Sequence, residues 1–210
     1  MSKYLGPKCK LCRREGEKLM LKGERCQTAK CAIVKKNYPP GMHGPKGRAS
    51  RQSGYNMQLR EKQKAKRIYN LLEKQFKLSF ERAIKQKGDA GENLLKILET
   101  RLDNVIYRLG FAQSRSQART LVSHGHFKVN DQKVDIPSFN VQTGDIIKIK
   151  ESSRTGKQFT NLAEKLKKVE APGWLNLEIK DFSAKVLHQP AKENFEMKIN
   201  AQTIVEFYSK

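Results

Sequence analysis

The sequence has no long run of apolar residues. Hydrophobic residues make up 37% of the 210 positions, and no run approaches the ~18–20 residues that a membrane-spanning helix needs. The first ten residues, MSKYLGPKCK, contain neither an apolar stretch of signal-peptide type nor a Ser- and Arg-rich amphipathic transit segment. We therefore expect no membrane partner, and we expect the chain to stay in the compartment where it is made.

Acidic residues are scarce relative to basic ones. The chain has 43 Lys and Arg against 21 Asp and Glu, a formal net charge of +22 at pH 7. Such an excess opposes compaction by self-repulsion unless a polyanion neutralises it. Residues 1–90 carry 24 basic and 7 acidic residues, so most of this contact is expected in the first half. Nucleic acid is the first candidate partner, and an anionic membrane surface is the second.

A catalytic constellation is also missing from the sequence. It contains no phosphate-binding loop motif and no Ser, His and Asp set with supporting local context. The single tryptophan, Trp174, is expected to anchor the core rather than to stack on a base. The sequence therefore predicts a binding protein and not an enzyme.

Cysteine does not occur after residue 31. Cys9, Cys12, Cys26 and Cys31 have the spacing C-x2-C-x13-C-x4-C. Two close pairs separated by a short loop can wrap one tetrahedral ion, and a segment with so little apolar material needs a staple. We expect one structural Zn²⁺ on four thiolates. An iron–sulfur cluster, two disulfides and four free thiols are the alternatives, of which disulfides are disfavoured without an export signal.

The segment after the cysteines is irregular and basic. Residues 37–56 are rich in Pro and Gly, which argues against regular structure. A Gly-rich backbone can approach phosphates closely, and Arg can stack on bases or fork onto phosphate. The candidate RNA contacts here and in the preceding arm are Arg13, Arg14, Tyr38, His43, Lys46, Arg48, Arg51 and Tyr55. The alternative is a disordered linker.

A helical pattern with one apolar stripe runs from Ile68 to Ile84. Its N-terminal extension is mostly cationic, and such a helix can pack one face on the protein and lay the other along a phosphate backbone. The candidate contacts are Arg60, Lys62, Lys64, Lys66 and Arg67. A merely solvated charged face is the alternative.

Residues 94–152 predict a compact module. The apolar spacing of three and four continues from Leu94 to Leu109, and Gly110 is expected to end that helix. A second helix opens at Ser114. Short strands are expected at 127–129, 133–134 and 146–150, where apolar residues alternate with a period of two. The module is thus a helix-turn-helix followed by a small sheet.

Within the module, the candidate RNA contacts are Arg108, Arg115, Arg119, His124 and Lys133. Arg115 and Arg119 are four residues apart and share a helix face. For Arg108 the alternative is a surface ion pair. The nearest acid, Asp103, is five residues away and off the favourable spacing of three or four, so we expect that pair to be weak. For His124 the alternative is a helix C-cap.

The run RLDNVIYRLGFA at 101–112, with Ser114-Arg115, Gln117-Ala118-Arg119 and His124-Gly125-His126, resembles the S-four-type RNA-binding module. So do Val129-Asn130, Ile136-Pro137-Ser138 and Gly144-Asp145. Outside the module, the segments GPKCKLCRREG at 6–16, NYPPG at 37–41, QLREKQK at 58–64 and IVEFYSK at 204–210 are similar to the bacterial small-subunit ribosomal protein S-four family. The similarity covers essentially the whole length and includes all four cysteines. It is loose at 187–190 and 201–202.

The resemblance implies an α+β fold. It has a zinc-stapled N-terminal arm (1–45), a mainly helical RNA-binding domain (46–97, completed by 178–210) and an inserted S-four-type module (98–177). It also implies a structural constituent of the bacterial small ribosomal subunit that binds 16S rRNA early in assembly of the 5′ domain. Family members border the place where mRNA enters, beside the small-subunit protein S-five, and influence translational accuracy. Some repress translation of their own messenger.

Two rival functions fit the sequence less well. An RNA-modifying enzyme with the same module, such as a pseudouridine synthase, would need a further catalytic domain, and the ~60 residues after the module are too few. A zinc-finger DNA-binding regulator would place a recognition helix near the cysteines, where Pro and Gly follow instead.

Overall fold

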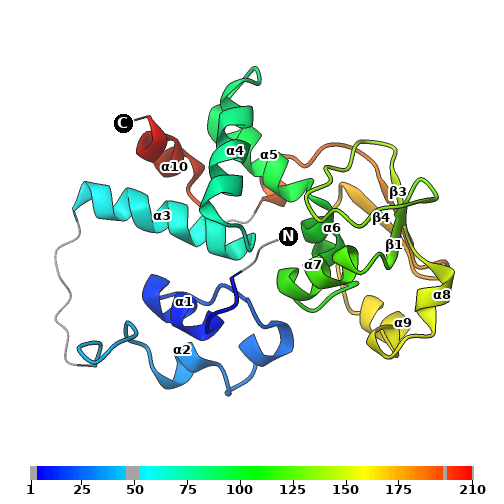
Figure 1. Ribbon diagram of the computed structural model, residues 1–210, viewed down its shortest axis with the longest axis horizontal. Coiled ribbons are helices and arrows are strands. Elements are labelled where there is room, and N and C mark those ends of the chain that lie inside the picture. Colours follow the sequence, from blue (N-terminus) through cyan, green and yellow to red (C-terminus); the bar gives the residue numbers. More distant parts are fainter. Residues whose placement is uncertain (1–3, 46–52, 196–197, 210) are drawn as a thin grey trace. The chain divides into compact units, whose positions relative to one another are not determined.

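The computed structural model describes residues 4–45, 53–195 and 198–209. The chain divides into two compact units, Met1–Leu94 with Met197–Lys210, and Leu95–Glu196. In the described ranges the first unit is helical and the second combines helices with a sheet (Figure 1). This confirms the α+β class. No helix of the described chain is long and apolar enough to cross a membrane.

The first unit begins with three short elements, α1 (Lys8–Glu15), η1 (Gly23–Cys26) and α2 (Ala32–Lys35). Longer helices follow: α3 (Gly54–Ile68), α4 (Glu73–Ile84) and the start of α5 (Ala90–Glu99), and α10 (Ala201–Tyr208) returns to pack on α3. The Ser53 hydroxyl accepts a hydrogen bond from the Asn56 N–H at 3.2 Å and so caps α3. The cationic residues 60–67 therefore lie on a regular helix.

The apolar stripe from Ile68 to Ile84 does not lie on one helix. The helix is interrupted between α3 and α4, where Asn70 adopts a left-handed backbone conformation with φ 54°. Tyr69 and Leu71 on either side are buried. Because both flanking positions are buried, they are occupied by apolar residues. The apolar spacing therefore continues through the sequence although the helix is interrupted.

The second unit opens with the end of α5, then α6 (Leu102–Arg108) and α7 (Arg115–Ser123). The expectation of one helix from Leu94 to Leu109 is wrong, because Arg101 is extended and forms a bridge with Asn140. The turn after α6 is as expected: Gly110 has φ 79°. The Ser114 hydroxyl accepts from the Gln117 N–H at 3.3 Å, which confirms the start of α7.

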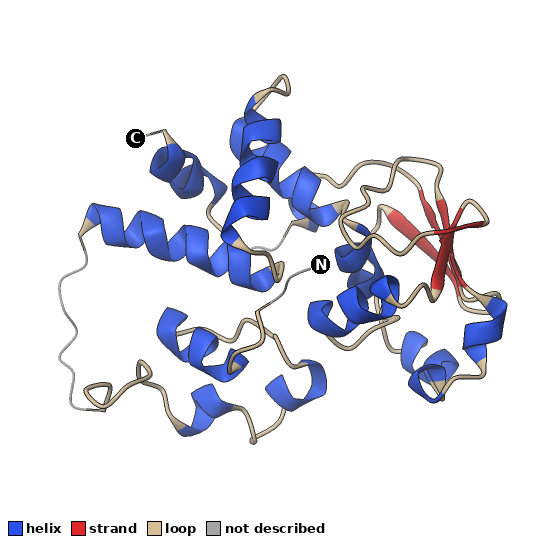
Figure 2. Cartoon of the chain, in the orientation of Figure 1, coloured by secondary structure: helices blue, strands red, loops and turns tan. Residues whose placement is uncertain are grey.

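The strands of the second unit, red in Figure 2, form one antiparallel sheet. Their order is β2-β1-β3-β5-β4. β1 (Phe127–Val129), β2 (Gln132–Lys133) and β3 (Ile146–Ile149) lie close to the predicted positions. α8 (Glu151–Arg154), η2 (Lys157–Phe159) and α9 (Leu162–Leu166) precede β4 (Leu175–Glu178) and β5 (Ser183–Val186), and η3 (Lys192–Asn194) ends the unit. The sheet continues beyond residue 177 because β5 pairs with both β3 and β4.

The core of the second unit lies between one face of the sheet and helices α6 and α7. Leu102, Val105 and Ile106 from α6 and Ala118 and Val122 from α7 are fully buried. They share one cluster with the inward-facing strand residues Phe127, Val129, Ile147, Ile149, Ala184 and Val186. Trp174 belongs to the same cluster and is 0% exposed, which confirms it as a core residue.

Candidate nucleic-acid interface

The four cysteines come from three elements of the N-terminal arm. Cys9 and Cys12 lie on α1, Cys26 ends η1 and Cys31 is the N-cap of α2. All four line one pocket, and all four thiols are free. Burial raises the pKa of the Cys12 thiol, and the three other sulfurs add to that rise. The four groups are therefore close enough to influence one another electrostatically.

These sulfurs do not form a closed ligand set. Within the described residues, no group of three or more His, Cys, Asp or Glu side chains is arranged to hold a metal ion. The donor chemistry is nevertheless that of a structural zinc site, with four soft sulfur groups in two close pairs. The backbone N–H of Lys22 donates a hydrogen bond to Cys26 Sγ at 3.3 Å.

Arg13 and Tyr38 contact each other. The Arg13 guanidinium lies 4.6 Å from the Tyr38 ring centroid, and its Nε donates to the Tyr38 carbonyl at 2.9 Å. Nη2 donates to the Pro39 carbonyl at 3.2 Å. This cation–π contact fixes the segment after α2 against α1. Both residues were predicted to contact RNA, and in the free chain they hold the arm together.

Glu15 joins α1 to α3. Its carboxylate, 3% exposed, pairs with Arg60 at 3.3 Å and with Arg67. Burial raises the pKa of Glu15, and the charges of Arg67 and Arg60 oppose that rise. Burial likewise lowers the pKa of Arg67. Arginine keeps its proton in proteins, and this carboxyl group engages two candidate RNA-binding arginines inside the first unit.

The lysines of α3 are held in the same way by Glu73 and by α10. Lys62 and Lys66 donate to the Glu73 carboxylate at 2.7 and 2.8 Å. Tyr208 donates its hydroxyl to the same carboxylate at 3.0 Å. The Lys62 ammonium lies 4.7 Å from the ring centroid of Phe207. Lys62 is buried, so it tethers α10 to α3 and does not offer an open cation.

The electrostatics of this cluster follow from its geometry. Burial alone would raise the pKa of Glu73, but hydrogen bonds from Lys62 and Lys66 outweigh it and lower the pKa to about 2. Burial and the Glu73 charge raise the pKa of Tyr208. Lys64 also lies in ion pairs, 3.4 Å from Glu17 and 3.3 Å from Glu61. The cationic side chains of α3 are thus largely neutralised within the unit.

In the second unit, Arg108 forms a bidentate ion pair. Its Nη2 and Nε lie 2.6 and 3.1 Å from the two carboxylate oxygens of Glu99, which is 0% exposed. Arg108 therefore has an ion pair, which was the alternative to an RNA contact, but its partner is Glu99 at the end of α5 and not Asp103.

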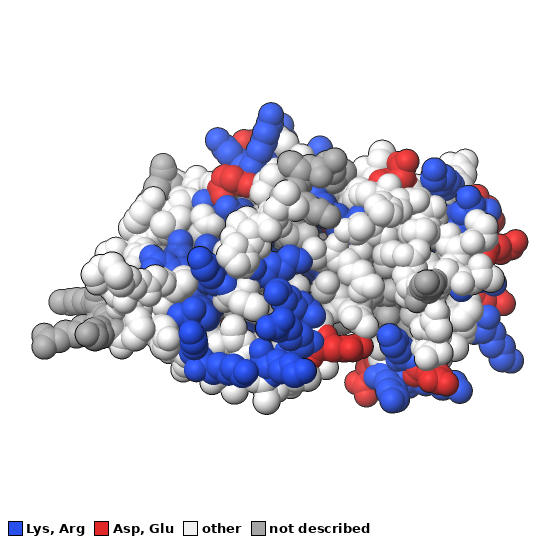
Figure 3. Space-filling view, turned by 60° about the horizontal axis from the view of Figure 1, so that its bottom comes forward, with Lys and Arg blue, Asp and Glu red and all other residues white. Residues whose placement is uncertain are grey.

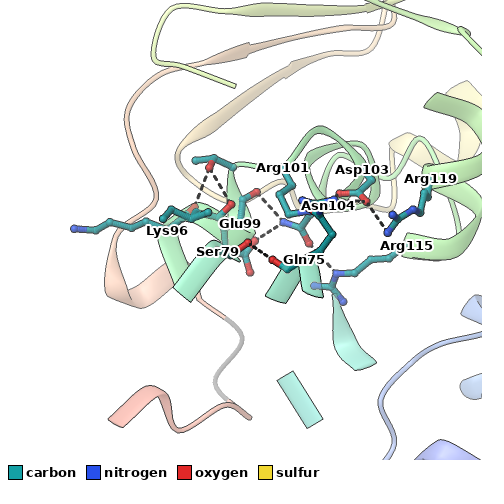
Figure 4. Close-up of polar contacts among 11 residues, drawn as sticks. Gln75, Ser79, Lys96, Glu99, Arg101, Asp103, Asn104, Arg115 and Arg119 are labelled. Atoms are coloured by element: carbon teal, nitrogen blue, oxygen red, sulfur yellow. Dashed lines mark hydrogen bonds and ion pairs between the residues drawn. The ribbon is translucent and has the colours of Figure 1, made fainter. Parts of the chain in front are cut away.

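Arg115 and Arg119 point into the second unit (Figure 4). Arg115 is 7% exposed; its Nε donates to Asn104 Oδ1 at 2.7 Å, and its guanidinium lies 4.5 Å from the Tyr107 ring centroid. Arg119, 4% exposed, lies 3.8 Å from the Asp103 carboxylate. Two consecutive residues of α6 thus hold the two arginines of α7.

The same two α6 residues have further partners. Asp103 accepts two hydrogen bonds from Arg101, at 3.2 and 3.3 Å. Burial raises the pKa of Asp103, against the charges of Arg101 and Arg119. Asn104 Nδ2 donates to a Glu99 carboxylate oxygen at 2.6 Å. The network thus links α5, α6 and α7 through groups that are almost completely buried (Figure 4).

The remaining candidates lie at the surface or outside the described residues. Arg14, His43, Tyr55 and Lys133 are exposed. His124 is exposed and is the C-cap of α7, which was the alternative reading. Lys46, Arg48 and Arg51 lie outside the described residues.

Arg14 is one of several exposed cations on the arm, and the others were not among the predicted contacts. Figure 3 shows Lys and Arg side chains gathered over the first unit with few acids among them. The exposed residues of α1, η1, α2 and their connections include Lys10, Arg14, Lys22, Arg25, Lys30, Lys35 and Lys36. Their exposure could have been foreseen, because an arm with so few apolar residues has almost no interior in which to bury them.

The chain matches two family models, the ribosomal protein S4/S9 N-terminal domain over residues 3–99 and the S4 domain over residues 100–147. Small ribosomal subunit protein uS4 of Caldicellulosiruptor saccharolyticus is 56% identical over 210 residues, with both chains covered completely. Small ribosomal subunit protein uS4A of Clostridium perfringens strain SM101 is 55% identical over 212 residues, and the uS4 protein of Clostridioides difficile is 54% identical over 210. Both of these alignments also cover the two chains completely.

Proposed function

Because the chain belongs to the small ribosomal subunit protein uS4 family, we propose that it is a primary binder of 16S rRNA in the bacterial ribosome of the cytoplasm. Its role is structural and not enzymatic. The exposed cations of the arm carry the proposal, since they are gathered on one face with few acids among them. Phosphate contacts from such a surface dominate the affinity for RNA.

We also propose a position in the subunit, on the basis of what the family resemblance implies. We place the protein in the 5′ domain, where its early binding nucleates assembly of that domain and the body. We also place it beside the small-subunit protein S-five and the path by which mRNA enters, where it contributes to translational accuracy. The net charge of +22 supports this placement among RNA helices, because a polyanionic environment offsets the self-repulsion of the chain.

The RNA contact is tested by salt dependence. Affinity for a 16S 5′-domain transcript, measured by filter binding over a KCl series, is compared between wild type and a variant with Lys10→Gln, Arg14→Gln and Lys30→Gln. Each lost phosphate contact lowers the slope of log affinity against log salt by about 0.7–0.9. The matched control carries Lys165→Gln, Lys167→Gln and Lys168→Gln, all exposed near α9. If the arm variant had the same slope as this control, the arm would not contact the RNA. Equal affinity of wild type for an unrelated duplex RNA would count against specific recognition.

Zinc is the metal we assign to the arm. Cys9, Cys12, Cys26 and Cys31 would hold it, and its role would be to cross-link three short elements that share little apolar surface. Their common pocket and free thiols support this assignment. Protein purified without chelator should contain about one zinc per chain by elemental analysis, and Cys12→Ser with Cys31→Ser should contain none. Metal-free wild type that retains its arm structure would contradict the assignment.

A further inference from the structure

The outer face of the sheet in the second unit carries lysines in register. Val129 and Ile147 point into the core, so the residues that alternate with them point outward. Lys128 on β1 is directly opposite Lys133 on β2 and directly opposite Lys148 on β3. Lys185 lies on β5, opposite Ile146. Three adjacent strands therefore present a continuous row of ammonium groups, with a fourth beside it.

This arrangement opposes the stability of the free chain. Like charges directly opposite each other on antiparallel strands are destabilising, and lysine is itself disfavoured in strands. Lys148 has an ion pair with Asp131 at 3.6 Å, but the Asp131 side chain is 78% exposed. In the described part of the chain no ion pair is found for Lys128, Lys133 or Lys185. The repulsion is therefore only weakly relieved within the molecule.

Protection of a sheet edge accounts for only part of the row. A charged lysine on an edge strand discourages pairing with other chains, and this explains Lys133 on β2. It does not explain Lys128 and Lys148, because β1 and β3 lie inside the sheet with a partner on each side. A threonine at either position would suit the strand better and remove the repulsion. The compensation must come from outside the chain.

We propose that the lysine row, Lys128, Lys133, Lys148 and Lys185, is a second phosphate-binding surface that contacts an RNA backbone, separate from the arm. The inference rests on the proposed RNA-binding function. Neighbouring strands lie ~4.8 Å apart, so the row offers closely repeated charges on flexible stems. Lysine acts as a point charge without the planar fork of arginine. Such a surface suits a repeating polyanion better than an individual carboxylate.

The test uses the full chain with Lys128→Gln, Lys133→Gln and Lys185→Gln combined. Filter binding to the 16S 5′-domain transcript over a KCl series should give a salt slope lower than wild type by roughly 2, at about 0.7–0.9 per contact. Affinity should fall at least tenfold at low salt. The control variant at Lys165, Lys167 and Lys168 should keep the wild-type slope, and Lys→Arg at the three sheet positions should restore it.

A second measurement checks folding and the physical premise together. Without RNA at low salt, the Gln variant should need at least as much urea to unfold as wild type, because the substitutions relieve repulsion. Weaker RNA binding by a variant that is at least as stable would support the inference. Wild-type RNA affinity and slope in the Gln variant would overturn it and leave an acidic protein as the partner for this face. If wild type itself did not bind the transcript, the proposed function would fail first.

Discussion

Arg115 and Arg119 occupy consecutive turns of α7 and both point into the second unit. The spacing of four correctly placed them on one face but did not show which face. Ala118 and Val122, which are fully buried, lie on that same face, because positions 115, 118, 119 and 122 follow the helical repeat. The apolar residues on this face therefore indicated that it is buried, but arginine was assumed to face outward.

Arg108 shows what spacing within a helix cannot reveal. Its partner Glu99 is nine residues away across the break at Arg101. Only the three-dimensional path of the chain brings the two side chains together. That the four cysteines lie near one another could, in contrast, be predicted from spacing alone, and all four do line one pocket.

Asp103 is the residue whose loss should matter most for folding of the second unit. Asp103→Ala removes the carboxylate shared by Arg101 and Arg119 and leaves two buried guanidinium groups without their counter-charge. The free energy of unfolding should fall by about 3–5 kcal/mol, measured by urea denaturation. Asp135→Ala, an exposed acid of the same unit, should change it by less than about 0.5 kcal/mol. Equal effects would show that the buried network is dispensable.

At the scale of elements, helix caps and the alternation of apolar residues were sufficient to predict α7 and strands β1 to β3 from the sequence. Ser114, Gly110 and the alternation at 146–149 act over a few residues, so the sequence shows them directly. The breaks at Asn70 and Arg101 were missed because buried residues on both sides continue the apolar stripe. β5 was missed because it pairs with β3, a strand more than thirty residues earlier in the chain, and β4 joins the sheet only through β5.

The attachment of α10 to α3 should weaken in acid. The pKa of Glu73 is lowered to about 2 from 4.5, so its pairing stabilises the fold above about pH 4.5, and this contribution is lost as the pH falls toward 2. Glu73 is 46% exposed, so solvent screening limits the effect to about 1 kcal/mol. Urea unfolding of wild type and Glu73→Gln should differ at pH 6 and converge near pH 2.

Glu81→Gln, an exposed acid on the same helix, is the control for that experiment. It should follow wild type across the pH range. If Glu73→Gln were as stable as wild type at pH 6, the cluster of Lys62, Lys66 and Tyr208 would not depend on this carboxylate for its stability.

At the scale of the whole molecule, the net charge of +22 opposes folding in the absence of RNA. The ion pairs of Glu15, Glu73 and Glu99 neutralise several cations, but the exposed lysines of the arm and of the sheet remain. Raising KCl from low to moderate concentration should therefore increase the urea concentration at the unfolding midpoint of the free protein. A midpoint that falls with salt would mean that the internal ion pairs outweigh the general repulsion.

The strand order has a consequence for synthesis on the ribosome. β3 keeps an unpaired edge until residues 183–186 have emerged, because β5 and not β4 is its neighbour. α3 likewise lacks its covering helix until residues 201–208 follow. Neither unit can complete its fold until these late segments have emerged, when most of the chain is already outside the exit tunnel. The nascent protein thus has a long interval in which its basic arm is available to RNA before its own fold is complete.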